Sequence, residues 1–178
     1  MTEHDEGRRS IEVEVPGTPQ EVWEAIATGP GISAWFVPSQ VDNLRLYLNH
    51  FRGRPSAAVS LAGGAPEAKA LAWAAMLGVL GLTAPIAGAR VRTAEASGVP
   101  ALRGVVERAG DEELLIRTSE TLAGLAAFEW DGRTTTVFRA ACFGPDPETL
   151  AAREAEVWGA WMHQHFPPQP TTVEANRS

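Results

Sequence analysis

The chain has 178 residues, enough for one full domain with its own core. Its 15 basic and 22 acidic side chains give a formal charge of −7, which disfavours nucleic acid and anionic lipid as partners. Cys142 is the single cysteine, so an internal disulfide and a thiolate-rich metal site are excluded and a reducing compartment is favoured. The N-terminus is charged and lacks the apolar core of a signal peptide, so we expect a cytoplasmic protein.

The first 55 residues predict one strand and two helices. Residues 11–15 alternate apolar and acidic side chains, which is the period of a half-buried strand. Thr18 and Glu21 are spaced as a capping box around Pro19, which predicts the start of a helix. Asp42 is placed to cap a second helix with an apolar stripe. That stripe consists of Leu44, Tyr47, Leu48 and Phe51.

A Gly- and Pro-containing linker at 53–56 predicts a boundary, after which the order of elements begins again. Asp131-Gly132 between two apolar runs is a strong hairpin signal, so the sheet is predicted to be mostly antiparallel. Asp146 and Pro147 predict the start of the last helix. The expected elements are a strand at 58–61, a helix at about 66–80, strands at 90–93, 102–108, 114–118, 123–130 and 134–143, and a helix at 147–165.

One uncharged segment has the length of a membrane span. Residues 70–89 contain no charged side chain, and about twenty such positions suffice to cross a bilayer. The segment is mostly alanine and contains Gly78, Gly81 and Pro85, which favours a buried helix followed by a loop. We therefore predict no membrane contact, with residues 1–10 and 169–178 as disordered ends.

Three stretches near the N-terminus carry a family resemblance: 11–16, 19–26 and 31–36. Together they look like the opening of bacterial AHSA-type proteins, which are relatives of the activator of a heat-shock-protein ATPase in the START-like or SRPBCC superfamily. Residues 42–48 resemble the closing helix of the same domain. The family places most of a sheet between these parts, so residues 11–55 resemble a truncated unit.

Residues 56–168 are similar in order to a whole helix-grip domain of that superfamily. The resemblance implies an α+β fold in which a curved antiparallel sheet packs on a long C-terminal helix, with residues 11–55 as an N-terminal partial repeat. Such domains typically enclose an apolar cavity between sheet and helix. Members include lipid carriers, metabolite binders, polyketide cyclases and co-chaperones, so the fold by itself leaves function open.

The C-terminal helix presents Trp158, Trp161 and Met162 on the face that is expected to meet the sheet. On the strands, charged residues such as Glu129 are expected to face outward, so the residues that alternate with them are expected to face the helix. Large rings and a thioether are suited to an apolar ligand, although plain core packing is the alternative interpretation. The predicted ligand-binding residues are Trp158, Trp161, Met162, Phe128, Trp130, Phe138, Cys142, Leu114, Ile116 and Leu77.

These residues favour non-enzymatic binding of a small apolar or aromatic molecule between sheet and helix. The resemblance implies one alternative, a co-chaperone-type interaction module of the stress response with a chaperone partner. A second alternative is a polyketide-cyclase- or hydrolase-like enzyme that uses Glu154. Its other candidate, His165, lies about 16 Å from Glu154 along a helix, so we assign no catalytic residue.

No metal ligand set and no cofactor are predicted, because His163 and His165 fall on different sides of the helix. The unit at 11–55 has too few strands to bury its own apolar residues. We expect it to pack on the second unit or to be exchanged across a homodimer.

Overall fold

The computed structural model describes residues 17–27, 41–130 and 132–168, of which the side chains at 24–27, 41, 42 and 130 are not described. The helices are α1 (Pro19–Ala27), α3 (Val41–His50), α4 (Lys69–Leu80) and α5 (Pro147–His165). The strands are β1 (Ser56–Ala65), β2 (Arg90–Arg92), β3 (Arg103–Ala109), β4 (Glu113–Arg117), β5 (Thr121–Trp130) and β6 (Arg133–Phe143). The strand predicted at 11–15 lies outside the described residues.

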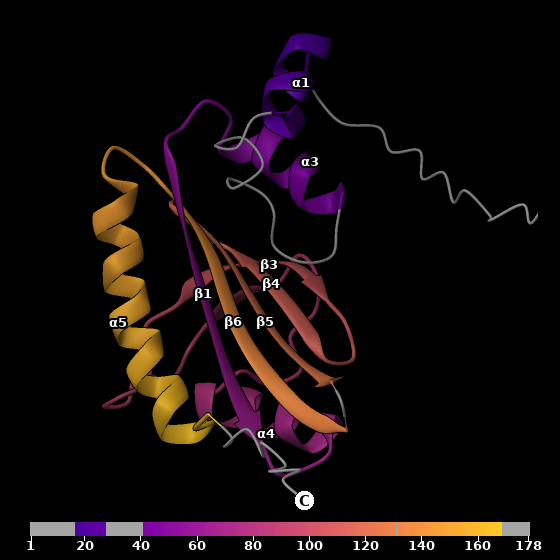
Figure 1. Cartoon of the computed structure of the whole chain (residues 1–178), viewed down its shortest axis with the longest axis vertical. Helices are drawn as coiled ribbons and strands as arrows, with labels where there is room; N and C mark the ends of the chain where they lie inside the picture. Colours follow the sequence, from indigo (N-terminus) through magenta and orange to yellow (C-terminus); the bar gives the residue numbers. More distant parts are fainter. Residues whose placement is uncertain (1–16, 28–40, 131, 169–178) are drawn as a thin grey trace, which may run out of the picture.

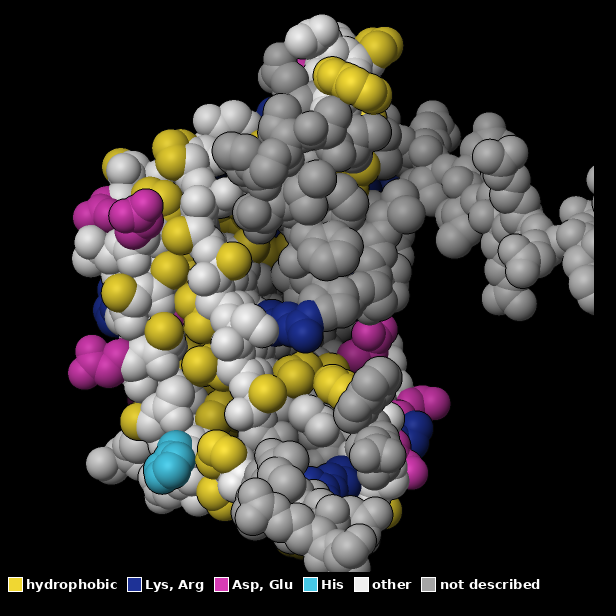
Figure 2. Space-filling model, viewed as in Figure 1, with side chains coloured by type: hydrophobic (Ala, Val, Ile, Leu, Met, Phe, Trp, Pro, Cys, Tyr) yellow, Lys and Arg dark blue, Asp and Glu magenta, His cyan; other side chains and the backbone are white. Residues whose placement is uncertain are grey.

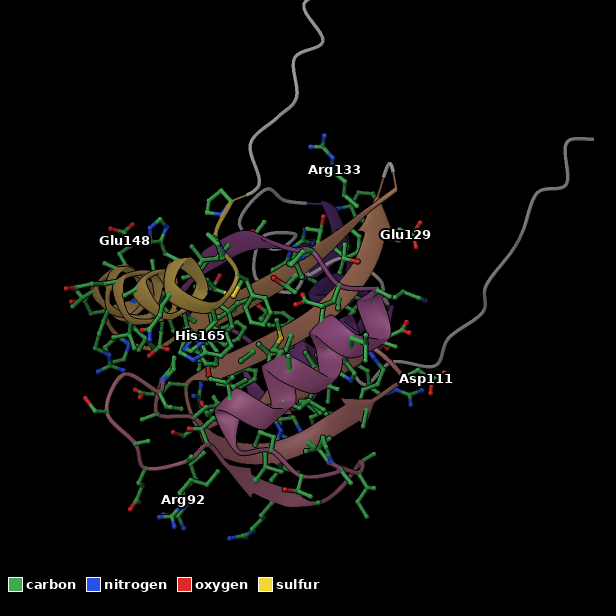
Figure 3. All side chains as sticks on the ribbon, turned by 90° about the horizontal axis from the view of Figure 1, so that it is seen from below. Arg92, Asp111, Glu129, Arg133, Glu148 and His165 are labelled. Carbon is green, nitrogen blue, oxygen red and sulfur yellow. The ribbon has the colours of Figure 1, made fainter. Side chains whose placement is uncertain are left out.

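The six strands form one antiparallel sheet in the order β1-β6-β5-β4-β3-β2 (Figure 1). Helix α5 packs along β1 and β6, and α4 packs against β5 and β6. Seen from below, the sheet curves around α4, and α5 lies at the open side of the curve (Figure 3). A curved antiparallel sheet that holds a long C-terminal helix is the helix-grip arrangement, so the predicted α+β fold class is confirmed.

The short-range signals in the sequence act as predicted. The Thr18 amide donates to Glu21 Oε2 at 2.7 Å and the Glu21 amide donates to Thr18 Oγ1 at 3.3 Å, which completes the capping box of α1. Asp146 Oδ1 accepts from the Thr149 amide at 3.2 Å and caps α5. Trp130 pairs with Arg133 across the predicted two-residue hairpin loop.

The sheet has two covered faces. The α5 face carries the main core, in which alternate residues of every long strand meet α4 and α5. The opposite side, called the α3 face below, is covered in part by α3. Its buried residues are Phe51, Leu115, Leu122, Ala141 and Phe143.

Helix α3 is held on the sheet mainly through the residue that follows it. The Phe51 ring stacks on the Phe143 ring with centroids 4.1 Å apart. Helix α1 packs on α3 through Val22, and Arg52 is paired with Glu21 at 2.9 Å. Helix α3 therefore packs on the sheet of the same chain and α1 packs on α3, which is the first of the two predicted arrangements.

The uncharged run at 70–89 forms a short helix and a loop. Helix α4 ends at Gly81, whose φ of 69° gives the left-handed cap that glycine adopts without strain. Buried residues of α4 such as Met76 and Leu80 contribute to the core of the α5 face. None of the described helices is both long and apolar enough to cross a membrane.

The first strand of the sheet is longer than the sequence predicts. We expected it to end at Leu61, before the glycines, but β1 continues through Gly63 and Gly64 to Ala65. A side chain at position 63 has no room, because an added Cβ would lie 2.8 Å from the Phe166 Cβ and closer still to the Phe166 carbonyl oxygen. The glycine thus allows the end of α5 to rest on the strand.

Replacing Gly63 with alanine is expected to lower the free energy of unfolding by about 1–3 kcal/mol, because the new methyl group collides with backbone rather than with a flexible side chain. Chemical denaturation measures the change. Gly159→Ala is the matched control, since nothing lies within 4 Å of its added Cβ and alanine favours a helix by up to about 1 kcal/mol. Equal stability of the Gly63 variant and the wild type would contradict the close approach.

Candidate functional site

The space predicted to hold a ligand, between the sheet and α5, is filled by side chains. Trp158 is 0% exposed and its ring stacks on Phe138 with centroids 4.0 Å apart. Trp161 is 1% exposed and meets the Trp158 ring edge to face at 5.6 Å. A water-sized void beside these rings would give them accessible surface, so they are packed as a core.

Most of the predicted site residues do come together there. Those that join Trp158, Trp161 and Phe138 in the core of the α5 face are Met162, Cys142, Leu114, Ile116 and, at its margin, Leu77. The sequence therefore identified a real cluster. Its members are too closely packed in this structure to form the wall of a cavity.

Phe128 is a correction to the predicted set. We expected it to face α5, but it is 39% exposed and lies on the α3 face, because Leu125 and Ala127 are the inward residues of β5. The expectation took Glu129 and Ala127 as outward residues, but Ala127 is buried in the core of the α5 face, and Glu129 lies exposed near the end of its strand, where either face reaches water. The side chain of Trp130 lies outside the described residues.

The acid considered for catalysis has a structural partner. Glu154 accepts a hydrogen bond from Trp158 Nε1 at 3.1 Å and another from Arg153 Nη2 at 3.2 Å. His165, at the other end of α5, packs against the Trp161 ring at 5.2 Å. Burial, with a smaller contribution from the Glu154 charge, raises the pKa of the Cys142 thiol to about 11, so this thiol stays protonated at neutral pH.

A hollow of about 510 Å³ lies on the α3 face, below the part of the sheet that α3 covers. Strands β5 and β6 line it with Gly124, Ala126, Phe128, Val137 and Arg139. The turn between β3 and β4 closes one side, with Arg108 and Glu113 next to it. Figure 2 shows this side of the molecule, where hydrophobic side chains lie exposed over the sheet with basic side chains among them.

The hollow exists because the middle strand carries small residues at this place. Gly124 pairs with Arg139 on one side and with Leu115 on the other, and Ala126 pairs with Val137 and Glu113. Paired residues of an antiparallel sheet point to the same face. Gly124 and Ala126 therefore form a low floor, and the larger side chains paired with them surround it. Volumes of 300–1,000 Å³ are usual for small-molecule sites, and this hollow falls in that range.

The charged groups of the hollow differ in how they are paired. Arg108 Nε is 2.7 Å from Glu113 Oε1, and Lys69 Nζ is 2.7 Å from Glu112 Oε2. Arg139 is partly buried and has no hydrogen bond or ion pair among the described residues. Burial lowers the pKa of its guanidinium from the usual value, although the group remains charged at neutral pH.

Metal ligands are not gathered in the described part of the chain, where no group of three or more His, Cys, Asp or Glu side chains is placed to hold an ion. The hollow offers an apolar floor, one aromatic ring and charged side chains of both signs, namely Arg108, Arg139, Asp111, Glu112 and Glu113.

No protein-family model matches the chain, and no curated protein matches it. Among solved structures it is similar to protein MLL2253 from Mesorhizobium loti, with 12% identity over 61% of this chain and 93% of that one and a TM-score of 0.48. An AHSA1-like protein from Rhizobium etli has 14% identity over 70% of this chain and 93% of that one, with a TM-score of 0.40.

DynU16, a protein of the dynemicin biosynthetic locus, has 16% identity over 63% of this chain and a TM-score of 0.44, and the chain spans about half its length (48%). At these identities a likeness bears on fold alone, and the fold assignment rests on the strand order and on the helix that the sheet holds. By that architecture the chain has a helix-grip fold.

Proposed function

We propose that the protein binds a small apolar or aromatic molecule without chemical conversion, and that the molecule lies in the hollow on the α3 face. The observation that carries the proposal is the hollow itself, about 510 Å³ over a floor of Gly124 and Ala126 with the exposed Phe128 ring at its side. An exposed aromatic ring beside small residues offers apolar area for a flat ligand.

The position differs from the cavity that the sequence predicts between the sheet and α5. That space holds stacked rings with no accessible surface, so a ligand there would have to displace the core. Displacing close-packed rings costs several kcal/mol, whereas entry into the hollow displaces only water. The co-chaperone-type alternative rests on the resemblance of residues 11–48 and stays a prediction.

The test is calorimetric titration with 1-naphthalenemethanol, a neutral two-ring probe, into the wild type and two matched variants. Ala126→Phe places a ring on the floor of the hollow and is expected to weaken binding at least tenfold. Ala58→Phe adds the same ring to an exposed position of β1, on the same face but outside the hollow, and is expected to bind as the wild type does.

The absence of saturable binding to the wild type at millimolar probe would overturn the proposal. So would an equal loss in both variants, since the effect would then not depend on the hollow. Thermal unfolding of each variant shows whether the added ring has disturbed the sheet.

A further inference from the structure

Two buried nitrogens in the hollow have no hydrogen bond among the described residues. They are Arg139 Nε and Arg108 Nη1. Buried polar groups are satisfied in the large majority of cases, and an unsatisfied charged donor is especially unfavourable. The packing of this face therefore leaves two donors of the hollow without an acceptor, and a bound ligand would supply one.

The two arginines lie in one row across the sheet. Arg139 pairs with Gly124, Gly124 pairs with Leu115, and Leu115 pairs with Arg108. Three strand spacings separate the ends of the row, about 14 Å at 4.7–4.9 Å per spacing. Gly124 has no side chain, so the floor next to Arg139 is low, and Leu115 is the one side chain of the row between Gly124 and Arg108.

The acids around the hollow leave Arg139 uncompensated. Glu113 is paired with Arg108, and Glu112 is paired with Lys69. Asp111 is exposed in the turn, at the outer margin of the molecule on the side away from α5 (Figure 3). Water screens that exposed carboxylate, whereas Arg139 is partly withdrawn from water and has no counter-charge among the described residues.

We propose that the molecule bound in the hollow is an organic carboxylate whose charged group pairs with Arg139. The free edge of one guanidinium, with Nε and a terminal nitrogen side by side, matches the two oxygens of a carboxylate. The free Nη1 of Arg108 provides a further donor from the other end of the row. The apolar part of the ligand then lies on Ala126, Val137 and Phe128.

This inference rests on the proposed function and sharpens it to a ligand class. Its test compares 1-naphthoate with 1-naphthalenemethanol, two probes with the same rings that differ in charge. The wild type is expected to bind naphthoate at least tenfold more tightly, and added salt is expected to weaken only naphthoate binding.

Arg139→Gln is expected to bring the two affinities together by weakening naphthoate alone. Arg139→Lys keeps the charge but loses the planar fork, so an intermediate affinity for naphthoate is expected. The control is Arg103→Gln, which removes an exposed arginine of β3 outside the hollow and should leave both affinities unchanged.

A second readout needs no ligand. Because Arg139 has no described partner, Arg139→Gln is expected to maintain or raise the melting temperature, whereas a structural arginine would lower it on removal. Equal binding of both probes to the wild type would overturn the carboxylate assignment and leave the proposed function standing. Failure of both probes to bind would overturn the proposed function as well.

Discussion

Replacing Trp158 with alanine is expected to lower the free energy of unfolding by about 3–5 kcal/mol, the usual loss when a buried indole is removed. The ring has no exposed surface, stacks on Phe138 and donates a hydrogen bond to Glu154. Its removal leaves a cavity on the central line of the α5 face and deprives the Glu154 carboxylate of a donor. Urea denaturation followed by circular dichroism measures the change.

Val157→Ala provides the matched control, because Val157 precedes Trp158 on α5 but is 45% exposed, so the loss should stay within about 0.5 kcal/mol. A loss below about 1 kcal/mol at Trp158 would contradict the description of a filled core. It would instead favour the cavity between sheet and helix that the sequence predicts.

Phe51→Ala is expected to release α3 from the sheet at a cost of about 3–5 kcal/mol. Phe51 is fully buried between the helix and Phe143, and the Arg54 guanidinium lies over its ring at 5.7 Å from the centroid. Tyr47 also reaches the Phe143 ring, with centroids 6.0 Å apart, but it is only partly buried, so the variant should lose protection of the α3 amides while β5 and β6 retain theirs. Hydrogen exchange resolves the two regions.

Asn49→Ala alters an exposed residue of the same helix and serves as the comparison. Its α3 amides should exchange at nearly the wild-type rate. Wild-type protection of α3 in the Phe51 variant would show that this ring does not hold the helix, and the association would then need another explanation.

Signals that depend on neighbouring residues were sufficient to predict the order of elements in the second unit. The hairpin loop at 131–132, the cap at Asp146 and the alternation of β6 each require only local backbone geometry. Alternation also placed Phe138 and Cys142 correctly on the α5 face. At these positions the tertiary contacts favour the same backbone conformation as the neighbouring residues do.

Predictions of which face a residue occupies failed where the marker lay near a strand end. Glu129 is exposed although it shares the parity of Leu125 and Ala127, so it misassigned Phe128 by one position. A central residue would have been a better marker, since Leu125 is buried and fixes the register of β5. Because successive side chains of a strand point to opposite faces, an error of one position assigns every residue of that strand to the wrong face.

The hollow could not be predicted from the sequence, because it results from incomplete coverage of a sheet face. Helix α3 covers Leu115, Leu122 and Ala141, whereas Gly124 and Ala126 are not part of that cluster and line the hollow. Only the pairing of β5 with β4 and β6 shows that these small residues stand between Arg139 and Glu113. A glycine in a strand was the single available hint.

The strand order leaves β1 and β2 at the margins of the sheet, and the two margins resist association with another molecule in different ways. At β1, the Gly64 amide donates to the Pro167 carbonyl at 3.2 Å, so the chain after α5 already occupies part of that margin. Strand β2 has only three residues, and two of them, Arg90 and Arg92, are exposed arginines. Arg92 is paired with Glu95 at 2.6 Å, so the short length of β2, over which a second copy could pair for only three residues, is what protects this margin of the sheet from association.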